Sequence, residues 1–131
     1  MKQFSVYAIT AVLAMVLAVA GFAGTKANQT LEGKLVCLGC TLKKNDGVQA
    51  QCSTYGHKGA LQTSDGSLWS FVENDRSKKL INDTSLHGKS VKVTGTIIEK
   101  AKRIDVASYE VDGKKQMWCE KCKMMGPEHS H

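Results

Sequence analysis

Two Cys-x-x-Cys pairs supply the residues best suited to chemistry in this 131-residue chain. The first pair is Cys37 and Cys40, and Cys52 and His57 follow it after gaps of 11 and four residues. Two thiolates separated by two residues can reach one ion at about 2.3 Å, and the later cysteine and histidine complete a tetrahedral set. The spacing predicts a zinc or copper site whose ligand atoms converge to within about 4 Å. Such an ion would contribute on the order of 10 kcal/mol, so chelation is expected to lower the melting temperature strongly.

The second pair, Cys119 and Cys122, belongs to a C-terminal segment rich in soft donor atoms. The other candidate ligands of this segment are Met117, Met124, Met125, His129 and His131. Thiolate, thioether and imidazole groups suit Cu(I), and the cysteines and histidines alone suit Zn(II). An alternative joins both pairs in a single four-cysteine site, which the geometry of a small barrel allows.

Disulfides and redox thiols are the alternatives to metal ligation at either pair. A Cys40–Cys52 disulfide, for example, would close a loop worth about 3 kcal/mol. Covalent haem attachment requires a histidine directly after the pair, and Thr41 and Lys123 stand there instead, so haem is excluded. A thioredoxin-like enzyme places its pair at a helix N-terminus, and the residues after Cys40 predict no helix. Thiol exchange on another architecture stays open.

Residues 1–27 have the pattern of a signal peptide. Lys2 precedes an apolar run of 20 residues from Phe4 to Ala23, and small residues then offer cleavage after Ala23 or Ala27. We therefore expect a periplasmic or secreted protein, with attachment to the membrane only if this segment is not cleaved. An oxidising compartment seldom leaves cysteines unused, so the five cysteines are expected to be ligands, disulfides or redox thiols.

The chain after the signal segment is long enough for one domain, expected at residues 28–116, with a Cys/Met/His-rich tail at 117–131. The sequence has 18 basic and 12 acidic residues, a net charge of +6. The lysines are spread along every segment, and together with export this predicts a solvated surface and no nucleic-acid partner. There is no Ser/His/Asp grouping and no evident carboxylate pair, so we expect no enzymatic activity.

Alternating apolar residues predict a mainly β domain with one short helix within 76–88. The expected strands are 30–38, 60–63, 67–73, 90–98 and 103–111. Asp65-Gly66 predicts a hairpin turn, and a change of phase near Ala107-Ser108 predicts a bulge. Residues 39–58 show no period and are expected to form a loop or a ligand-bearing excursion. The side chains expected in the core are Leu35, Trp69, Phe71, Val91, Val93, Ile97, Ile104 and Val106.

The order of strand, loop, hairpin, short helix and two further strands resembles the five-stranded OB barrel. The resemblance is carried by the residues from Leu86 to Ile97, Leu-His-Gly-Lys-Ser-Val-Lys-Val-Thr-Gly-Thr-Ile, and by Ile104-Asp105-Val106. More narrowly, residues 30–111 are similar to small secreted bacterial domains of unassigned function. These carry a Cys-rich segment between strands one and two and a Gly-His element, here Gly56-His57, before a hairpin. The resemblance implies an OB-like barrel preceded by a helical signal segment.

The leading interpretation is an exported, non-enzymatic domain that binds zinc or copper through Cys/His clusters. Its partners would be a metal ion and, as a further candidate, another envelope protein. The alternatives are a disulfide-stapled periplasmic interaction module and a thiol redox protein.

Overall fold

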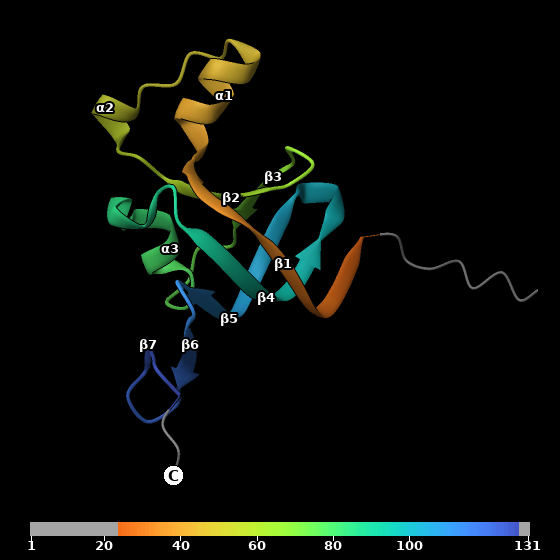
Figure 1. The fold of residues 1–131 in the computed structure, drawn as a ribbon, viewed down its shortest axis with the longest axis vertical. Coiled ribbons are helices and arrows are strands. Elements are labelled where there is room, and N and C mark those ends of the chain that lie inside the picture. The colour runs from red at the N-terminus through yellow and green to blue at the C-terminus, as the bar shows by residue number, and fades with distance from the viewer. Residues whose placement is uncertain (1–23, 129–131) are drawn as a thin grey trace, which may run out of the picture.

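The computed structural model describes residues 24–128, and the expected OB-like barrel is confirmed (Figure 1). The strands are β1 (Thr25–Cys37), β2 (Gly59–Thr63), β3 (Leu68–Phe71), β4 (Ser90–Ile98), β5 (Arg103–Val111), β6 (Lys114–Cys119) and β7 (Met124–Gly126). The helices are α1 (Leu38–Asp46), α2 (Cys52–Tyr55), α3 (Lys78–Asn82) and the short 3₁₀ turns η1 (Thr84–Leu86) and η2 (Glu99–Ala101).

Five strands close into the barrel in the order β3-β2-β1-β4-β5, and a parallel pairing of β3 with β5 completes the ring. All other pairings are antiparallel. Closure pairs the edges of β3 and β5 with each other, which leaves the barrel itself without a free edge. The short α3 and η1 between β3 and β4 match the helix expected within residues 76–88.

The core forms where the period-two pattern predicted it. All eight side chains expected inside are buried, each with at most 8% of its surface exposed. Leu61, Leu80, Ile81, Leu86 and Tyr109 join them in one apolar cluster. The inward faces of the barrel strands and the cover formed by α3 and η1 therefore make up a single core.

The expected bulge lies in β5. Thr94 is paired with Ser108 and the next residue, Gly95, with Val106, which leaves Ala107 as the extra residue. A β-carbon on Gly95 would collide with the backbone carbonyl of Asp105, so only glycine permits this close approach. The extra residue reverses the alternation and places Tyr109 inside, as the change of phase predicted.

Local structure differs from expectation in two places. Residues 39–58 form the ligand-bearing excursion that the sequence predicted, but they are not irregular: they carry α1 and α2 and project from one end of the barrel (Figure 1). The tail expected from residue 117 begins inside β6, and β6 and β7 form a hairpin that extends the sheet from β5 at the opposite end. Both differences arise from local hydrogen bonding, which apolar periodicity does not report.

The signal segment expected at residues 1–27 lies outside the described residues as far as residue 23. Residues 25–27 belong to β1, which begins earlier than the predicted start at residue 30. Within residues 24–128, no helix has the length and apolar character needed to span a membrane.

Candidate metal centre

The segment that carries the first cysteine cluster is an insertion in the β1–β2 hairpin. Cys37 is the last residue of β1 and is paired with Gly59, the first residue of β2. The Leu38 N–H also donates to the Lys58 carbonyl at 2.8 Å. The two ends of the insertion, residues 38–58, are therefore held together by the barrel before any ligand side chain is considered.

Each ligand side chain is positioned by a short helix or by the pairing of the strands. Cys37 is the N-cap of α1, and Cys40 lies in the first turn of that helix. Cys52 is the first residue of α2. Gly56, with φ of +87°, ends α2 and donates its N–H to the Cys52 carbonyl at 2.8 Å, which turns the chain so that His57 faces the cysteines.

The four predicted ligand atoms converge. They all lie within 4.8 Å of one another, close to the expected separation of about 4 Å. The Cys37 and Cys52 sulfurs are 3.6 Å apart, and His57 Nδ1 lies 3.3 Å from Cys37 Sγ and 3.5 Å from Cys40 Sγ. A tetrahedral zinc site with ordinary bond lengths has sulfur–sulfur edges of about 3.8 Å and sulfur–nitrogen edges of about 3.6 Å. The cluster could therefore hold a metal ion with little movement.

The pKa values of the cluster thiols are shifted in opposite directions. Burial by itself would raise the pKa of Cys37, but hydrogen bonds from the Cys40 backbone and from the side chains of His57, Cys40 and Cys52 lower it to about 7. The pKa of Cys40 is raised to about 11, first by its hydrogen bond with Cys37 and then by that with Cys52. One thiolate is thus available near neutral pH, and a bound cation would have to displace the proton of Cys40.

The N-terminal end of α1 also favours a thiolate at Cys37, because the unpaired N–H groups of a helix's first turn carry partial positive charge. The sequence argument that no helix follows Cys40 was therefore wrong. The pair does lie at a helix N-terminus, although on a barrel and not on a thioredoxin-like fold.

The helices of the insertion contribute nothing to an apolar core. Neither α1 nor α2 contains a buried residue, and Val48 and Tyr55 expose 41% and 76% of their surfaces. Cys40 and His57 are exposed, whereas Cys37 and Cys52 are half-buried. The four ligands therefore form the only evident centre around which the described insertion could be organised.

Two residues near the cluster were not singled out by the sequence argument. A β-carbon on Gly39 would lie 2.7 Å from Cys52 Sγ, so the residue directly before Cys40 must be small. His87 Nε2 is buried without a hydrogen-bond partner, and the pKa of His87 is lowered first by burial and then by the charge of His57. The glycine directly before Cys40 was visible in the sequence, but the proximity of His87 to His57 depends on the fold.

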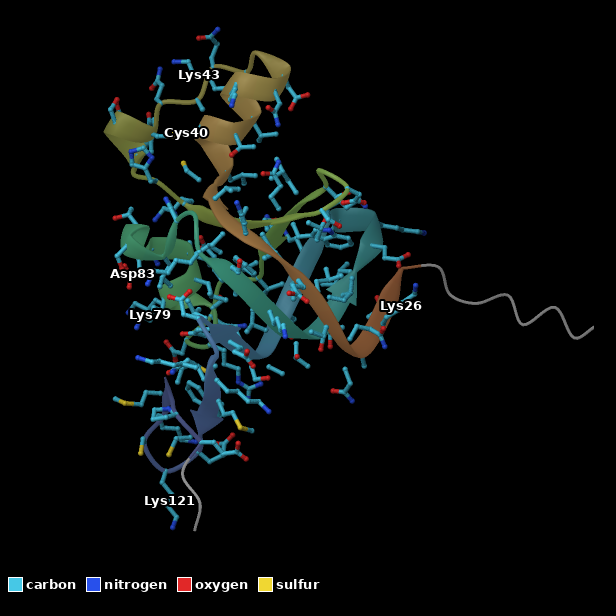
Figure 2. The ribbon with its side chains drawn as sticks, viewed as in Figure 1. Lys26, Cys40, Lys43, Lys79, Asp83 and Lys121 are labelled. Carbon is cyan, nitrogen blue, oxygen red and sulfur yellow. The ribbon has the colours of Figure 1, made fainter. Side chains whose placement is uncertain are left out.

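The remaining candidate ligands do not join this cluster. Cys40 and Lys121, which lies between Cys119 and Cys122, are at opposite ends of the molecule, so the single four-cysteine site is not formed (Figure 2). All five cysteines lie within the described residues, and none forms a disulfide, so the alternative Cys40–Cys52 bridge is not formed either. Met117, Met124 and Met125 lie on the β6–β7 hairpin. The candidate ligands His129 and His131 lie outside the described residues.

Comparison of the chain with protein-family models, with curated proteins and with solved structures found no match.

Proposed function

We propose that this chain is an exported, non-enzymatic metal-binding domain whose Cys37/Cys40/Cys52/His57 cluster takes zinc. The observation that carries the proposal is the convergence of four ligand atoms on an insertion whose helices contain no buried residue. A segment without apolar packing cannot offset the entropy of ordering its backbone, and a bound ion can supply the missing free energy.

The choice of zinc follows from the ligand set. Three thiolates and one imidazole in a tetrahedron are a common structural zinc site, and the observed atom separations need little adjustment. Cu(I) also accepts thiolates, which makes it the competing ion at this cluster. Four protein ligands fill the coordination shell and leave no open position for a substrate, which supports a binding role over a catalytic one.

The exposure of the cluster supports reversible binding. Cys40 and His57 are accessible to solvent, so a chelator or another protein could approach two of the four ligands directly. The closed barrel beneath would stay folded while the insertion gains or loses its ion. We therefore propose that metal exchange orders and loosens residues 38–58 without unfolding the domain.

Export is part of the proposal, and the position of β1 favours one cleavage site. Thr25 and Lys26 are paired with Ile98 and Ile97, and the Lys26 ammonium lies 2.8 Å from the Glu99 carboxylate. Cleavage after Ala27 would remove these contacts, whereas cleavage after Ala23 would keep them. The mature protein is therefore proposed to begin at Gly24, which its mass would verify.

The test combines metal analysis with a thiol count on protein isolated from the compartment to which it is exported. Zinc is expected at one equivalent per chain, with the three cluster thiols shielded from alkylation until a chelator is added. Cys52→Ser should lose the ion, whereas Ser53→Ala, a change at the next and exposed position of α2, should retain it. Metal-free protein whose cluster cysteines resist alkylation before reduction would overturn the proposal.

One observation favours a second candidate, a thiol redox protein. Cys37 lies at a helix N-terminus with its pKa lowered to about 7, and its sulfur is 3.6 Å from that of Cys52. A modest movement would let these two thiols form a disulfide, with two electrons and two protons passing to a partner disulfide. Exchange with a small-molecule disulfide that is equally fast with and without saturating zinc would favour this candidate.

A further inference from the structure

The β6–β7 hairpin places the second Cys-x-x-Cys pair in a tight turn. Cys119 ends β6, Cys122 lies in the turn, and Met124 begins β7 directly opposite Cys119. Lys123 has φ of +52° and donates its N–H to the Cys119 carbonyl at 2.8 Å, which closes the turn. The two cysteines are thus held on one compact turn of backbone and not on a loose tail.

The backbone of this turn is directed at a sulfur atom. The Cys122 N–H donates to Cys119 Sγ at 3.1 Å. An N–H group aimed at sulfur stabilises a thiolate in place, and a thiolate is the form that binds metals.

The strand register separates the sulfur-containing residues into two faces. Met117 and Cys119 are two residues apart on β6, and Met124 is the partner of Cys119, so the three share one face of the hairpin. Trp118 and Met125 are paired on the other face.

The second face packs inward. Met125 packs against the barrel core, and the Arg76 guanidinium lies over the Trp118 ring at 5.4 Å from its centroid. The thioether of Met125 is thereby committed to packing, and only the Met117/Cys119/Met124 face remains available for a ligand.

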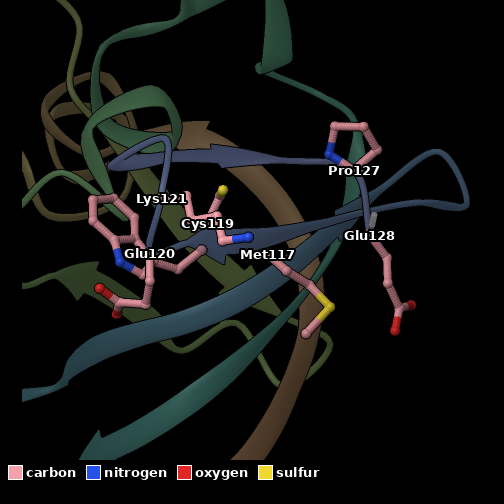
Figure 3. A pocket seen from close by; sticks show the side chains of 7 residues that line it. Met117, Cys119, Glu120, Lys121, Pro127 and Glu128 are labelled. Atoms are coloured by element: carbon pink, nitrogen blue, oxygen red, sulfur yellow. The ribbon is translucent and has the colours of Figure 1, made fainter. Parts of the chain in front are cut away.

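The available face is open to solvent. Met124 exposes 60% of its surface, and among the large apolar side chains of the described residues only Tyr55 is more exposed. A cavity of about 340 Å³ lies beside Met117 and Cys119, with Pro127 and Glu128 on its rim (Figure 3). Met124 lies opposite Cys119, and a side chain this exposed gains little from packing, so its thioether is available as a donor atom.

We propose that the β6–β7 hairpin is a second metal site, specific for Cu(I), in which Cys119 and Cys122 are the thiolate ligands and Met124 and Met117 supply thioether sulfur. Thiolate and thioether are the donors that select Cu(I), whereas zinc sites use cysteine, histidine and carboxylate and make no use of thioether sulfur. Each coordinating thiol gives up its proton, and copper keeps its oxidation state throughout. The site lies at the opposite end of the barrel from the Cys37 cluster and does not depend on the function proposed for that cluster.

The test is an anaerobic competition titration of Cu(I) against a chromogenic chelator, with the full chain already loaded with zinc. One equivalent of Cu(I) is expected to bind without displacing zinc and to protect Cys119 and Cys122 from alkylation. Met124→Leu should weaken Cu(I) binding by about tenfold or more, a loss in the range seen when groups around a metal are removed. Met125→Leu is the matched control: it changes the neighbouring thioether on the inward face and should leave the affinity unchanged.

Three results would overturn the inference. Equal effects of Met124→Leu and Met125→Leu would remove the role of the outer face. Displacement of zinc while Cys119 and Cys122 stay reactive would place copper at the first cluster instead. A Cys119–Cys122 disulfide that persists under the reducing conditions would leave only a local bridge. Alkylation of the wild-type chain supplies the second and third of these results even if the variants fold poorly.

Discussion

Removal of zinc should destabilise the barrel by much less than the full binding free energy of the ion, and therefore by less than the figure of about 10 kcal/mol that the ligand spacing alone suggested. All four ligands lie within residues 37–57, so an unfolded chain keeps every donor in one short segment. Peptides with such ligand sets bind zinc on their own, with apparent free energies of about 10–16 kcal/mol. Only the difference in zinc affinity between the folded and the unfolded chain stabilises the fold.

The β1–β2 pairing sets the size of that difference. Cys37 is paired with Gly59 in the folded chain, so the insertion is already closed at its base. In the unfolded chain, closing a loop of about 20 residues costs about 3 kcal/mol. The folded chain should therefore bind zinc about a hundredfold more tightly than the isolated segment. Chelation should lower the free energy of unfolding by about 3 kcal/mol and the melting temperature by about 10–15 °C.

The assay is urea unfolding of the reduced chain, with saturating zinc and with excess chelator. A synthetic peptide of residues 36–58 supplies the zinc affinity of the unfolded segment. His57→Ala should reduce the zinc-dependent shift, which would tie it to the cluster. A shift near 10 kcal/mol would mean that the unfolded chain does not bind zinc, and no shift would mean that the barrel does not pre-organise the site. Either result refutes the argument from loop closure.

Three further predictions concern single substitutions and pH. Gly39→Ala should weaken zinc binding by about 10- to 100-fold in an indicator titration, because the new β-carbon would displace the Cys52 sulfur, 2.7 Å away. Gly24→Ala is the control: its β-carbon would lie 3.9 Å from the nearest atom, and this variant should bind zinc normally. Val93→Asp should cost several kcal/mol, more than half the stability of a domain of this size, because it buries an unpaired charge; a folded variant in urea unfolding would contradict the core assignment. The apparent zinc affinity should fall as pH falls, because zinc must displace the Cys40 proton (pKa about 11) over the whole range. The dependence on pH should steepen below about pH 7, where Cys37 is also protonated. An affinity that does not vary between pH 6 and 9 would exclude thiolate ligation.

The sequence was most informative where a pattern has a single geometric meaning. Period-two alternation can be satisfied only by strands with one face inside, and Val91, Val93 and Ile97 are buried as that requires. The spacing of Cys37, Cys40, Cys52 and His57 predicted a convergence that the structure shows. In both cases the types and spacing of the side chains are enough to predict the structure.

Prediction failed where backbone hydrogen bonds determine the local structure. Helix α1 was missed because Lys-Lys-Asn-Asp-Gly looked unfavourable for a helix, yet the same residues end one: Gly47 has φ of +67° and bonds back to the Lys43 carbonyl. The β5–β6 hairpin was missed although Asp112-Gly113 is the same two-residue signal that was recognised at Asp65-Gly66. The proximity of His87 to His57 depends on tertiary contacts between segments and has no local signal.

The closed base of the insertion makes residues 38–58 an exchangeable module. Everything that recognises the ion enters and leaves the barrel through one pair of adjacent strands, at Cys37 and Gly59. A two-residue turn in its place would leave the β1–β2 register and the core unchanged, and would produce a barrel of the same fold without the first cluster. Conversely, the segment could be transplanted onto another hairpin of matching register. The fold and its metal chemistry can therefore change independently, in evolution or by engineering.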